Sequence, residues 1–178
     1  MRPAFATETG MTEREFMELP ESMDKIELLD GEMIVSPSPT LRHQRIVATL
    51  FDALRGWTAE HGPAEALMSP LDIRFGPDRI LQPDLLVFLG GLPADPPMPL
   101  TTVPDIAIEV MSSKRAWDRY VKRSVYLEAG VREVWVVDAE NRAVEVYGRG
   151  DGMLVFTDTL TSPHLPGFAL EVAGIFPA

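Results

Sequence analysis

Two carboxylates lie inside segments that otherwise have the character of buried β-strands. Asp84 follows Pro83 in the segment "QPDLLVF", and Glu109 interrupts the apolar run "PDIAIEV". Charged side chains are rarely buried unless they are paired or bound to a metal. The two strands are consecutive and are therefore expected to be neighbours, about 4.8 Å apart. Carboxylates on one face at that spacing repel each other, so one is protonated or a cation lies between them.

A divalent cation is the more consequential of these possibilities. Mg²⁺ is typically bound by one or two carboxylates together with waters and phosphate oxygens. An ion held in this way activates water and stabilises charge on a phosphate group, so the pattern suggests phosphodiester chemistry. The structural alternative is that Asp84 ends a strand after Pro83 while Glu109 pairs with an arginine. The residues alone leave both interpretations open.

Local patterns predict the elements that must position these carboxylates. Thr12 begins a short helix with the spacing of a capping box, and Asp30-Gly31 between two apolar segments predicts a β-hairpin. Amphipathic helices are predicted over 41–61 and 116–128. Strands are predicted over 64–75, 80–89, 105–111, 132–138, 142–148 and 153–158. This order predicts an α/β or α+β fold in which helices flank a mixed sheet.

Length and composition limit the number of domains and the classes of function that the chain can have. The chain has 178 residues, most economically one domain spanning 1–178, and 46% of them are hydrophobic. Its net charge of −11 and pI of about 4.7 argue against a protein that coats nucleic acid through a basic face. There are no cysteines for disulfides or thiolate metal sites. No segment resembles a signal peptide or a membrane span, so a cytoplasmic protein without membrane partners is expected.

The order and spacing of these segments resemble the PD-(D/E)xK nuclease superfamily. The likeness is carried by "QPDLLVF", "PDIAIEV" and the downstream "YLEAGVREVWVVD", and it extends from "ELLDGE" at 27 to "VEVY" at 144–147. More narrowly, the chain is similar to a large bacterial family of restriction endonuclease-like proteins long considered to be of unknown function. The resemblance implies a restriction-endonuclease-like core with flanking helices and an N-terminal β-hairpin, which binds Mg²⁺ or Mn²⁺ and cleaves phosphodiester bonds.

Carried onto this sequence, the motif makes Asp84 and Glu109 metal ligands, together with the backbone carbonyl of Val110. The motif also has a lysine two residues after its second acid, and here Met111 stands in that place. In the family pattern a lysine stands instead on the following helix, at Lys122. The resemblance implies that this lysine orients or deprotonates the attacking water or stabilises charge on the phosphate.

Helix geometry predicts that the side chain of Lys122 can reach the predicted metal ligands. On a helical wheel of 116–128, an apolar stripe that includes Tyr120 faces the core, and Lys122 lies on the flank of that stripe. From there its aliphatic stem can cross apolar surface to the sheet edge. The alternative is a surface pair with Asp118 at i, i+4, which contributes only about 0.3–0.5 kcal/mol. Lys114 is a rival candidate, but its place at the strand exit favours solvation.

Four auxiliary residues complete the expected site. Glu32, directly after the hairpin turn, matches the additional acid that superfamily members place near the first core helix. His43 matches the histidine that begins the long helix in this family, although a hydrogen-bonded core histidine is an equally good interpretation. Gln82 and Tyr126 are candidates for groups that support the metal ligands.

These observations leave three functions. The first is a metal-dependent endonuclease acting on nucleic acid, with DNA favoured, as a homodimer whose two-fold axis relates two cutting sites. The second is a catalytically inactive dimeric binding protein that keeps the nuclease fold, which Met111 and the acidic net charge favour somewhat. The third is a two-carboxylate glycosidase, which needs an acid pair about 5–9.5 Å apart in a sugar-binding cleft. No aromatic-rich groove pattern supports the third.

Overall fold

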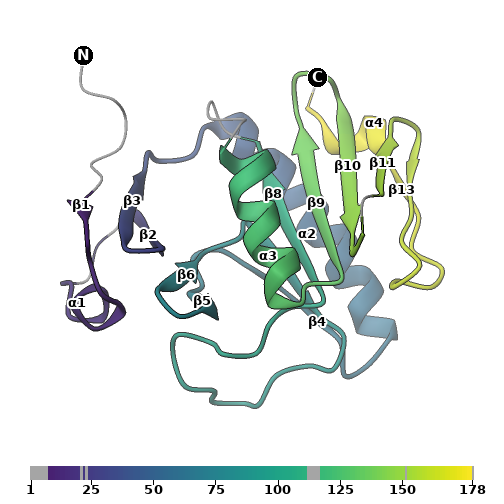
Figure 1. The fold of residues 1–178 in the computed structure, drawn as a ribbon. Coiled ribbons are helices and arrows are strands. Elements are labelled where there is room, and N and C mark those ends of the chain that lie inside the picture. Colours follow the sequence, from purple (N-terminus) through teal and green to yellow (C-terminus); the bar gives the residue numbers. More distant parts are fainter. Residues whose placement is uncertain (1–7, 21, 23, 112–116, 151, 178) are drawn as a thin grey trace.

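The computed structural model describes residues 8–20, 22, 24–111, 117–150 and 152–177. Within these residues the main sheet has six strands and forms the centre of the molecule (Figure 1). Its order from edge to edge is β11 (Met153–Phe156), β10 (Ala143–Gly148), β9 (Glu133–Asp138), β8 (Ile106–Val110), β7 (Leu85–Phe88) and β4 (Glu65–Met68). Strands β8 and β9 are parallel and the other neighbours are antiparallel, which confirms the predicted mixed sheet.

A second sheet carries the N-terminal hairpin. In the described part of the chain its five strands are ordered β1 (Glu8–Thr9), β3 (Glu32–Ser36), β2 (Lys25–Leu29), β6 (Arg79–Leu81) and β5 (Ile73–Gly76). The predicted Asp-Gly turn joins β2 to β3, and Asp30 and Gly31 have φ values of 50° and 84°. Two successive positive φ values are typical of a type I′ turn, which matches the twist of the paired strands.

Short elements complete the chain. The predicted capping box is present at Thr12, before α1 (Glu13–Met17). Near the C-terminus, β12 (Thr159–Leu160) pairs with β13 (Leu170–Glu171), and α4 (Val172–Ile175) follows. None of the helices in the described residues is both long and apolar enough to cross a membrane.

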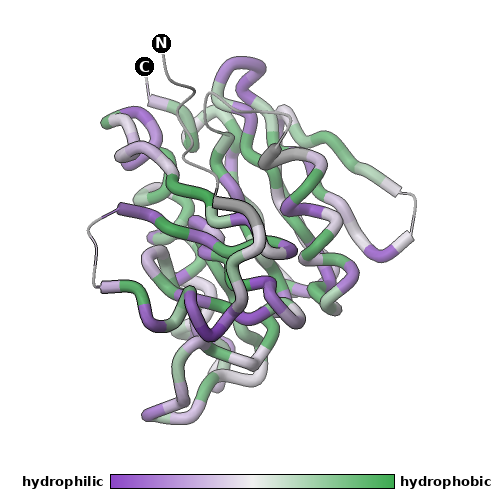
Figure 2. Tube along the Cα trace, turned by 60° about the vertical axis from the view of Figure 1, so that its left-hand side comes forward, coloured by the Kyte–Doolittle hydropathy of each residue, from purple (hydrophilic) through white to green (hydrophobic). Residues whose placement is uncertain are grey.

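Helices cover the two faces of the main sheet, α2 (Leu41–Glu60) on one and α3 (Arg123–Ala129) on the other (Figure 1). Side chains alternate between the faces along each strand. Ile106 and Ile108 of β8 therefore share a core with α2, whereas Ala107 belongs to the core on the α3 side. Figure 2 shows the hydrophobic segments running through the interior. By the same alternation, Glu109 projects toward α3.

The predicted strands over 64–75 and 80–89 are each two strands that lie in different sheets. Strands β4 and β7 belong to the main sheet, whereas β5 and β6 belong to the second sheet. Pro70 and Pro83 explain the breaks, because proline has no N–H to donate to a sheet ladder. The chain thus crosses from the second sheet to the main sheet at residues 82–84. This crossing puts Asp84 at the junction of the two sheets.

The predicted helix over 116–128 differs from the observed one in its first half. Segment η1 (Trp117–Lys122) is π-helical and leads directly into α3, which ends at Gly130 with a left-handed φ of 112°. A π-turn adds a residue to the turn and so rotates the side chains around the helix axis. Tyr120 is 56% exposed, whereas Lys122 is 2% exposed. The prediction of a buried Tyr120 was therefore wrong, and Lys122 faces the interior rather than a flank.

Candidate active site

Asp84 is held by groups from three different elements. Its Oδ2 accepts a hydrogen bond from the backbone N–H of Val110 at 2.9 Å and lies 3.1 Å from Nε2 of His43 on α2. Its Oδ1 pairs with the Nζ of Lys25 on β2 at 3.1 Å. The contact with Val110 links Asp84 to the residue directly after Glu109. The two predicted carboxylates therefore lie at the same end of neighbouring strands.

Glu109 is buried on the α3 side of the sheet and is 2% exposed. Its Oε1 accepts a hydrogen bond from the Tyr126 hydroxyl at 2.5 Å and lies 3.3 Å from the Nζ of Lys122. Both partners come from the helical segment that covers this face. The structure thus places Lys122 beside Glu109, the acid that the motif normally combines with a lysine at position 111.

Glu27 on β2 is a buried acid that the sequence analysis missed. Its Oε1 lies 2.8 Å from the Nζ of Lys122 and accepts a hydrogen bond from the backbone N–H of Gln82 at 2.8 Å. Its side chain has no exposed surface. The segment "KIELL" carries the same signal as Asp84 and Glu109, a lone carboxylate in an apolar strand. That signal could have found Glu27.

Lys25 is the second residue that sequence reasoning missed. It stands two positions before Glu27 on β2, so both side chains leave the strand on the same face. Nothing in the local sequence distinguishes Lys25 from a solvated lysine at the start of a strand. Only the packing of the second sheet against Asp84 reveals its contact.

The assembled cluster is almost balanced in charge. It holds the carboxylates of Glu27, Asp84 and Glu109, the ammonium groups of Lys25 and Lys122, and the imidazole of His43. Three acids and two ammonium groups are compatible with burial because each charge has a close partner of the opposite sign.

The environment shifts several protonation equilibria in this cluster. Burial alone would raise the pKa of Asp84, but the ammonium of Lys25 and the contact with His43 hold it well below its usual range. Burial likewise opposes protonation of His43 and Lys25, yet nearby carboxylates, above all Asp84, raise the pKa of both. Burial and the neighbouring Glu109 raise the pKa of Tyr126 far above its ordinary value, so this phenol remains a hydrogen-bond donor.

The carboxylates of Asp84 and Glu109 are the groups that could hold a divalent ion. Among the described residues, no group of three or more His, Asp or Glu side chains is arranged to hold a metal ion. Asp84 and Glu109 nevertheless match the need of Mg²⁺, which commonly uses one or two carboxylates and completes its shell with water and phosphate. Oε2 of Glu27 is also buried without a hydrogen-bond partner in the described part of the chain. A water or an ion that completes its hydrogen bonding is one explanation for a buried acceptor of this kind.

The remaining residues considered in the sequence analysis lie at the border of the cluster, away from it, or outside the described residues. Gln82 borders the cluster, where its backbone binds Glu27 and its side chain binds Asp72 at 2.8 Å. Glu32 is exposed at the turn end of the β2–β3 hairpin, away from the ion pairs described above, and Glu27 is the hairpin acid that joins the cluster. Lys114 and the side chain of Asp118, the alternative partner of Lys122, lie outside the described residues.

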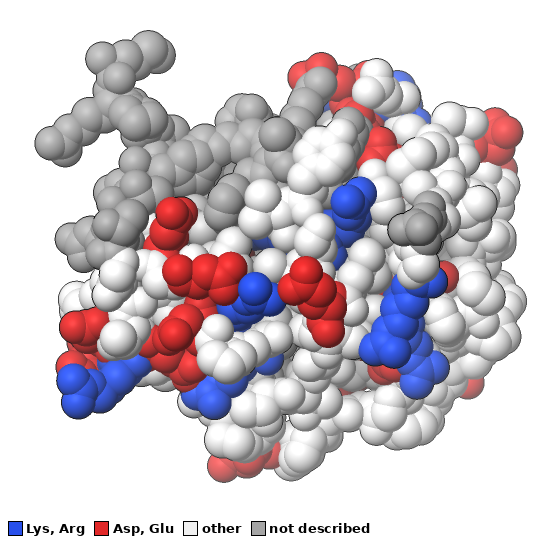
Figure 3. Space-filling view, in the orientation of Figure 1, with Lys and Arg blue, Asp and Glu red and all other residues white. Residues whose placement is uncertain are grey.

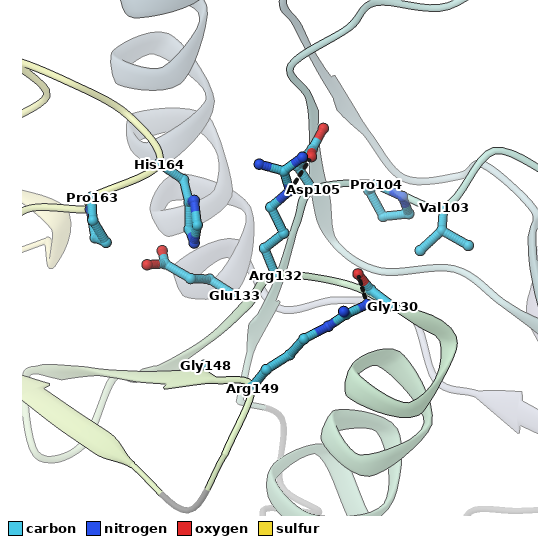
Figure 4. A pocket seen from close by; sticks show the side chains of 10 residues that line it. All are labelled: Val103, Pro104, Asp105, Gly130, Arg132, Glu133, Gly148, Arg149, Pro163 and His164. Atoms are coloured by element: carbon cyan, nitrogen blue, oxygen red, sulfur yellow. Dashed lines mark hydrogen bonds and ion pairs between the residues drawn. The ribbon is translucent and has the colours of Figure 1, made fainter.

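A separate hollow of about 630 Å³ opens at the other end of β8 and β9 (Figure 4). Its arginines already have partners: Arg132 pairs with Asp105 at 2.9 Å, and Arg149 donates to the carbonyl of Gly130 at 2.9 Å. Its buried Glu133 accepts hydrogen bonds from two neighbouring side chains. The cluster around Asp84 is therefore the better candidate for chemistry.

Positive and negative side chains are interspersed on the face of the molecule that Figure 3 draws. On the face seen in Figure 3, Lys and Arg groups are separated from one another, and Asp and Glu groups lie beside several of them. Arg79, for example, pairs with Asp30 at 2.7 Å and with Glu128 at 2.9 Å. Such a mixed surface fits the net charge of −11. It differs from the continuous basic face of a protein that coats nucleic acid.

Comparisons with known proteins agree with this architecture. A solved structure, described as "a putative nuclease belonging to DUF820" from Anabaena variabilis, superposes with a TM-score of 0.79 and 23% sequence identity. The match covers 93% of this chain and 97% of the other, and it shows that the two share a fold. No curated protein sequence matches the chain. The model of the family Uma2, "Putative restriction endonuclease", matches residues 14–173, and the chain therefore belongs to this family.

Proposed function

We propose that this protein is a divalent-metal-dependent nuclease that hydrolyses phosphodiester bonds in nucleic acid, with DNA as the favoured substrate. One observation carries the proposal. Asp84 just before β7, Glu109 on β8 and Lys122 on η1 belong to one buried cluster, in which Lys122 Nζ lies 3.3 Å from Glu109 Oε1 and Asp84 accepts a hydrogen bond from the residue after Glu109. Family membership supports a nuclease-like activity, and the ion, the substrate and the residue roles are our proposal.

In this proposal Asp84, Glu109 and the backbone carbonyl of Val110 hold Mg²⁺ or Mn²⁺. Such an ion, when bound, generates a nucleophilic water and stabilises charge on the phosphate. The protein's own task is to fix its ligands. The backbone N–H of Val110 and the imidazole of His43 orient Asp84, while the Tyr126 hydroxyl orients Glu109. Partners of this kind determine how rigidly metal ligands are held.

Lys122 supplies the positive charge that the motif expects from position 111. Its ammonium lies between the carboxylates of Glu27 and Glu109, which position it beside the proposed metal ligands. There the ammonium can donate a hydrogen bond that orients the attacking water, or stabilise charge that develops on the phosphate. Glu27 acts as a positioning residue, since it contacts Lys122 rather than Asp84.

We also propose that residues 1–178 act as one restriction-endonuclease-like domain and that two copies form a homodimer. Cutting both strands of a duplex is simplest with two sites related by a two-fold axis. This part of the proposal follows from the geometry of a duplex substrate.

A second candidate function is a catalytically inactive binding protein that retains the nuclease fold. Two observations favour it. Met111 occupies the position where the motif has its lysine, and the ammonium groups of Lys25 and Lys122 already pair with the three carboxylates of the cluster.

A cleavage assay separates the two functions. We expect the wild type to cleave supercoiled plasmid or single-stranded DNA with Mg²⁺ or Mn²⁺, and to be inactive with EDTA. Asp84→Asn and Lys122→Met should each lower the rate by about 100-fold or more, the scale of losing a charged group from a reacting centre. Arg123→Met, which removes a neighbouring cation that lies 4.4 Å from the Tyr147 ring, is the matched control and should stay within a few-fold.

Circular dichroism must show that each variant is folded before its rate is compared. Full activity in Lys122→Met would refute the role of this lysine. Activity that is equal in wild type and Asp84→Asn would refute the role of Asp84 as a metal ligand. Absence of metal-dependent cleavage of any DNA or RNA substrate would favour the inactive binding protein.

A further inference from the structure

Lys25 is a cation that the nuclease motif does not include, yet it contacts the first acid of the motif directly. Its Nζ lies 3.1 Å from Oδ1 of Asp84. The other oxygen, Oδ2, is held by the backbone N–H of Val110 and by His43. Oδ1 is therefore the side of Asp84 at which an incoming cation would have to bind, and Lys25 stands there.

The two lysines of the cluster are held very differently. The side chain of Lys122 is 3% exposed and lies within 3.3 Å of two buried carboxylates, Glu27 and Glu109. The side chain of Lys25 is 23% exposed and contacts Asp84 at the partly buried rim of the cluster. A lysine ammonium sits on a flexible four-carbon stem. Lys25 can therefore swing toward solvent without opening the core, whereas Lys122 cannot.

Resting on the metal-dependent function proposed above, we infer that Lys25 is a built-in counter-ion that competes with a divalent cation for Oδ1 of Asp84. In the metal-free protein its ammonium neutralises Asp84 beside Glu27 and Glu109. An ammonium and a divalent ion repel each other strongly at contact distance in a partly buried site. Lys25 must therefore leave Oδ1 when the ion binds, and the cost of this displacement weakens metal binding.

If Lys25 competes with the metal ion, its removal changes metal affinity in the opposite direction from the removal of a group that supports a metal ligand. Removing a group that supports a metal ligand lowers metal affinity. Removing Lys25 should raise it, because the competing charge is gone. A lysine that serves only to contact the phosphates of nucleic acid would leave metal affinity unchanged.

The test is isothermal calorimetry with MnCl₂ in the absence of nucleic acid. Full-length wild type, Lys25→Met and Lys25→Gln are compared at one pH and ionic strength. Arg55→Met is the matched control, since it also removes one positive charge, from an exposed position on α2. We expect both Lys25 variants to bind Mn²⁺ about tenfold or more tightly than wild type, and the control to stay within twofold.

Thermal melting supplies a second readout. Without metal, Lys25→Met should melt below wild type, because Asp84 loses its counter-ion, and it should gain more in melting temperature from Mn²⁺. If wild type binds Mn²⁺ and both Lys25 variants bind no more tightly, the competition is refuted while the proposed metal site stands. If neither wild type nor any Lys25 variant binds Mn²⁺, the proposed metal site is refuted and this inference with it.

Discussion

Replacing Lys122 by methionine tests whether the buried cluster is held by charge. The side chain of Lys122 is 3% exposed, and its carboxylate partners Glu27 and Glu109 are 0% and 3% exposed. Removing one partner of a buried ion pair leaves an uncompensated charge and typically costs about 3–5 kcal/mol. Two carboxylates share this ammonium, so we expect Lys122→Met to lower the free energy of unfolding by an amount in this range.

The assay is urea unfolding at neutral pH without divalent ions, followed by circular dichroism. Arg123→Met on the same helical segment removes a cation that lies 4.4 Å from the Tyr147 ring, and it should cost about 1 kcal/mol or less. Adding Glu27→Gln to Lys122→Met removes one of the stranded charges and should restore part of the loss. A Lys122→Met loss below about 1 kcal/mol, or a further loss on adding Glu27→Gln, would refute the reasoning.

Two further predictions concern stability. The contact with Asp84 raises the pKa of His43 despite burial, so its contribution to stability is present below the ordinary imidazole pKa of about 6.5 and is lost as pH rises through the raised value. The unfolding free energy lost in His43→Asn should therefore be larger at pH 5.5 than at pH 9, and an equal loss at both would contradict this linkage. Gly91 has a φ of 68°, and an added Cβ would lie 2.5 Å from the Pro63 carbonyl oxygen. Gly91→Ala should lower the free energy of unfolding by about 2 kcal/mol. Gly90→Ala should not, because an added Cβ there meets no atom within 4 Å. Equal melting temperatures of the two variants would contradict the close contact between Gly91 and Pro63.

Features set by local chemistry were predictable from the sequence. The Asp-Gly turn specified the β2–β3 hairpin, and the apolar repeat specified α2 to within one residue. The lone carboxylates Asp84 and Glu109 indicated a polar site between neighbouring strands, and β7 and β8 do pair. These predictions succeeded because each depends on residues that are close in the chain or on strands that are consecutive in it.

Features that depend on packing between distant elements were not predictable in the same way. The segments 64–75 and 80–89 were each predicted as one strand, whereas Pro70 and Pro83 divide them, and which sheet each half joins is decided by the second sheet as a whole. The π-helical turn of η1 rotates the side chains relative to an α-helix, so an α-helical wheel gave the wrong phase for Tyr120. Glu27 joins the cluster only because β2 pairs with β6, next to the crossing at 82–84.

The most direct test of the central claim is an anomalous difference map from crystals of the wild type soaked in Mn²⁺. The account predicts a peak bonded to the carboxylates of both Asp84 and Glu109, with the Nζ of Lys25 displaced from Oδ1 of Asp84. Manganese bound at other positions while this cluster remains empty, with Lys25 still paired to Asp84, would contradict it.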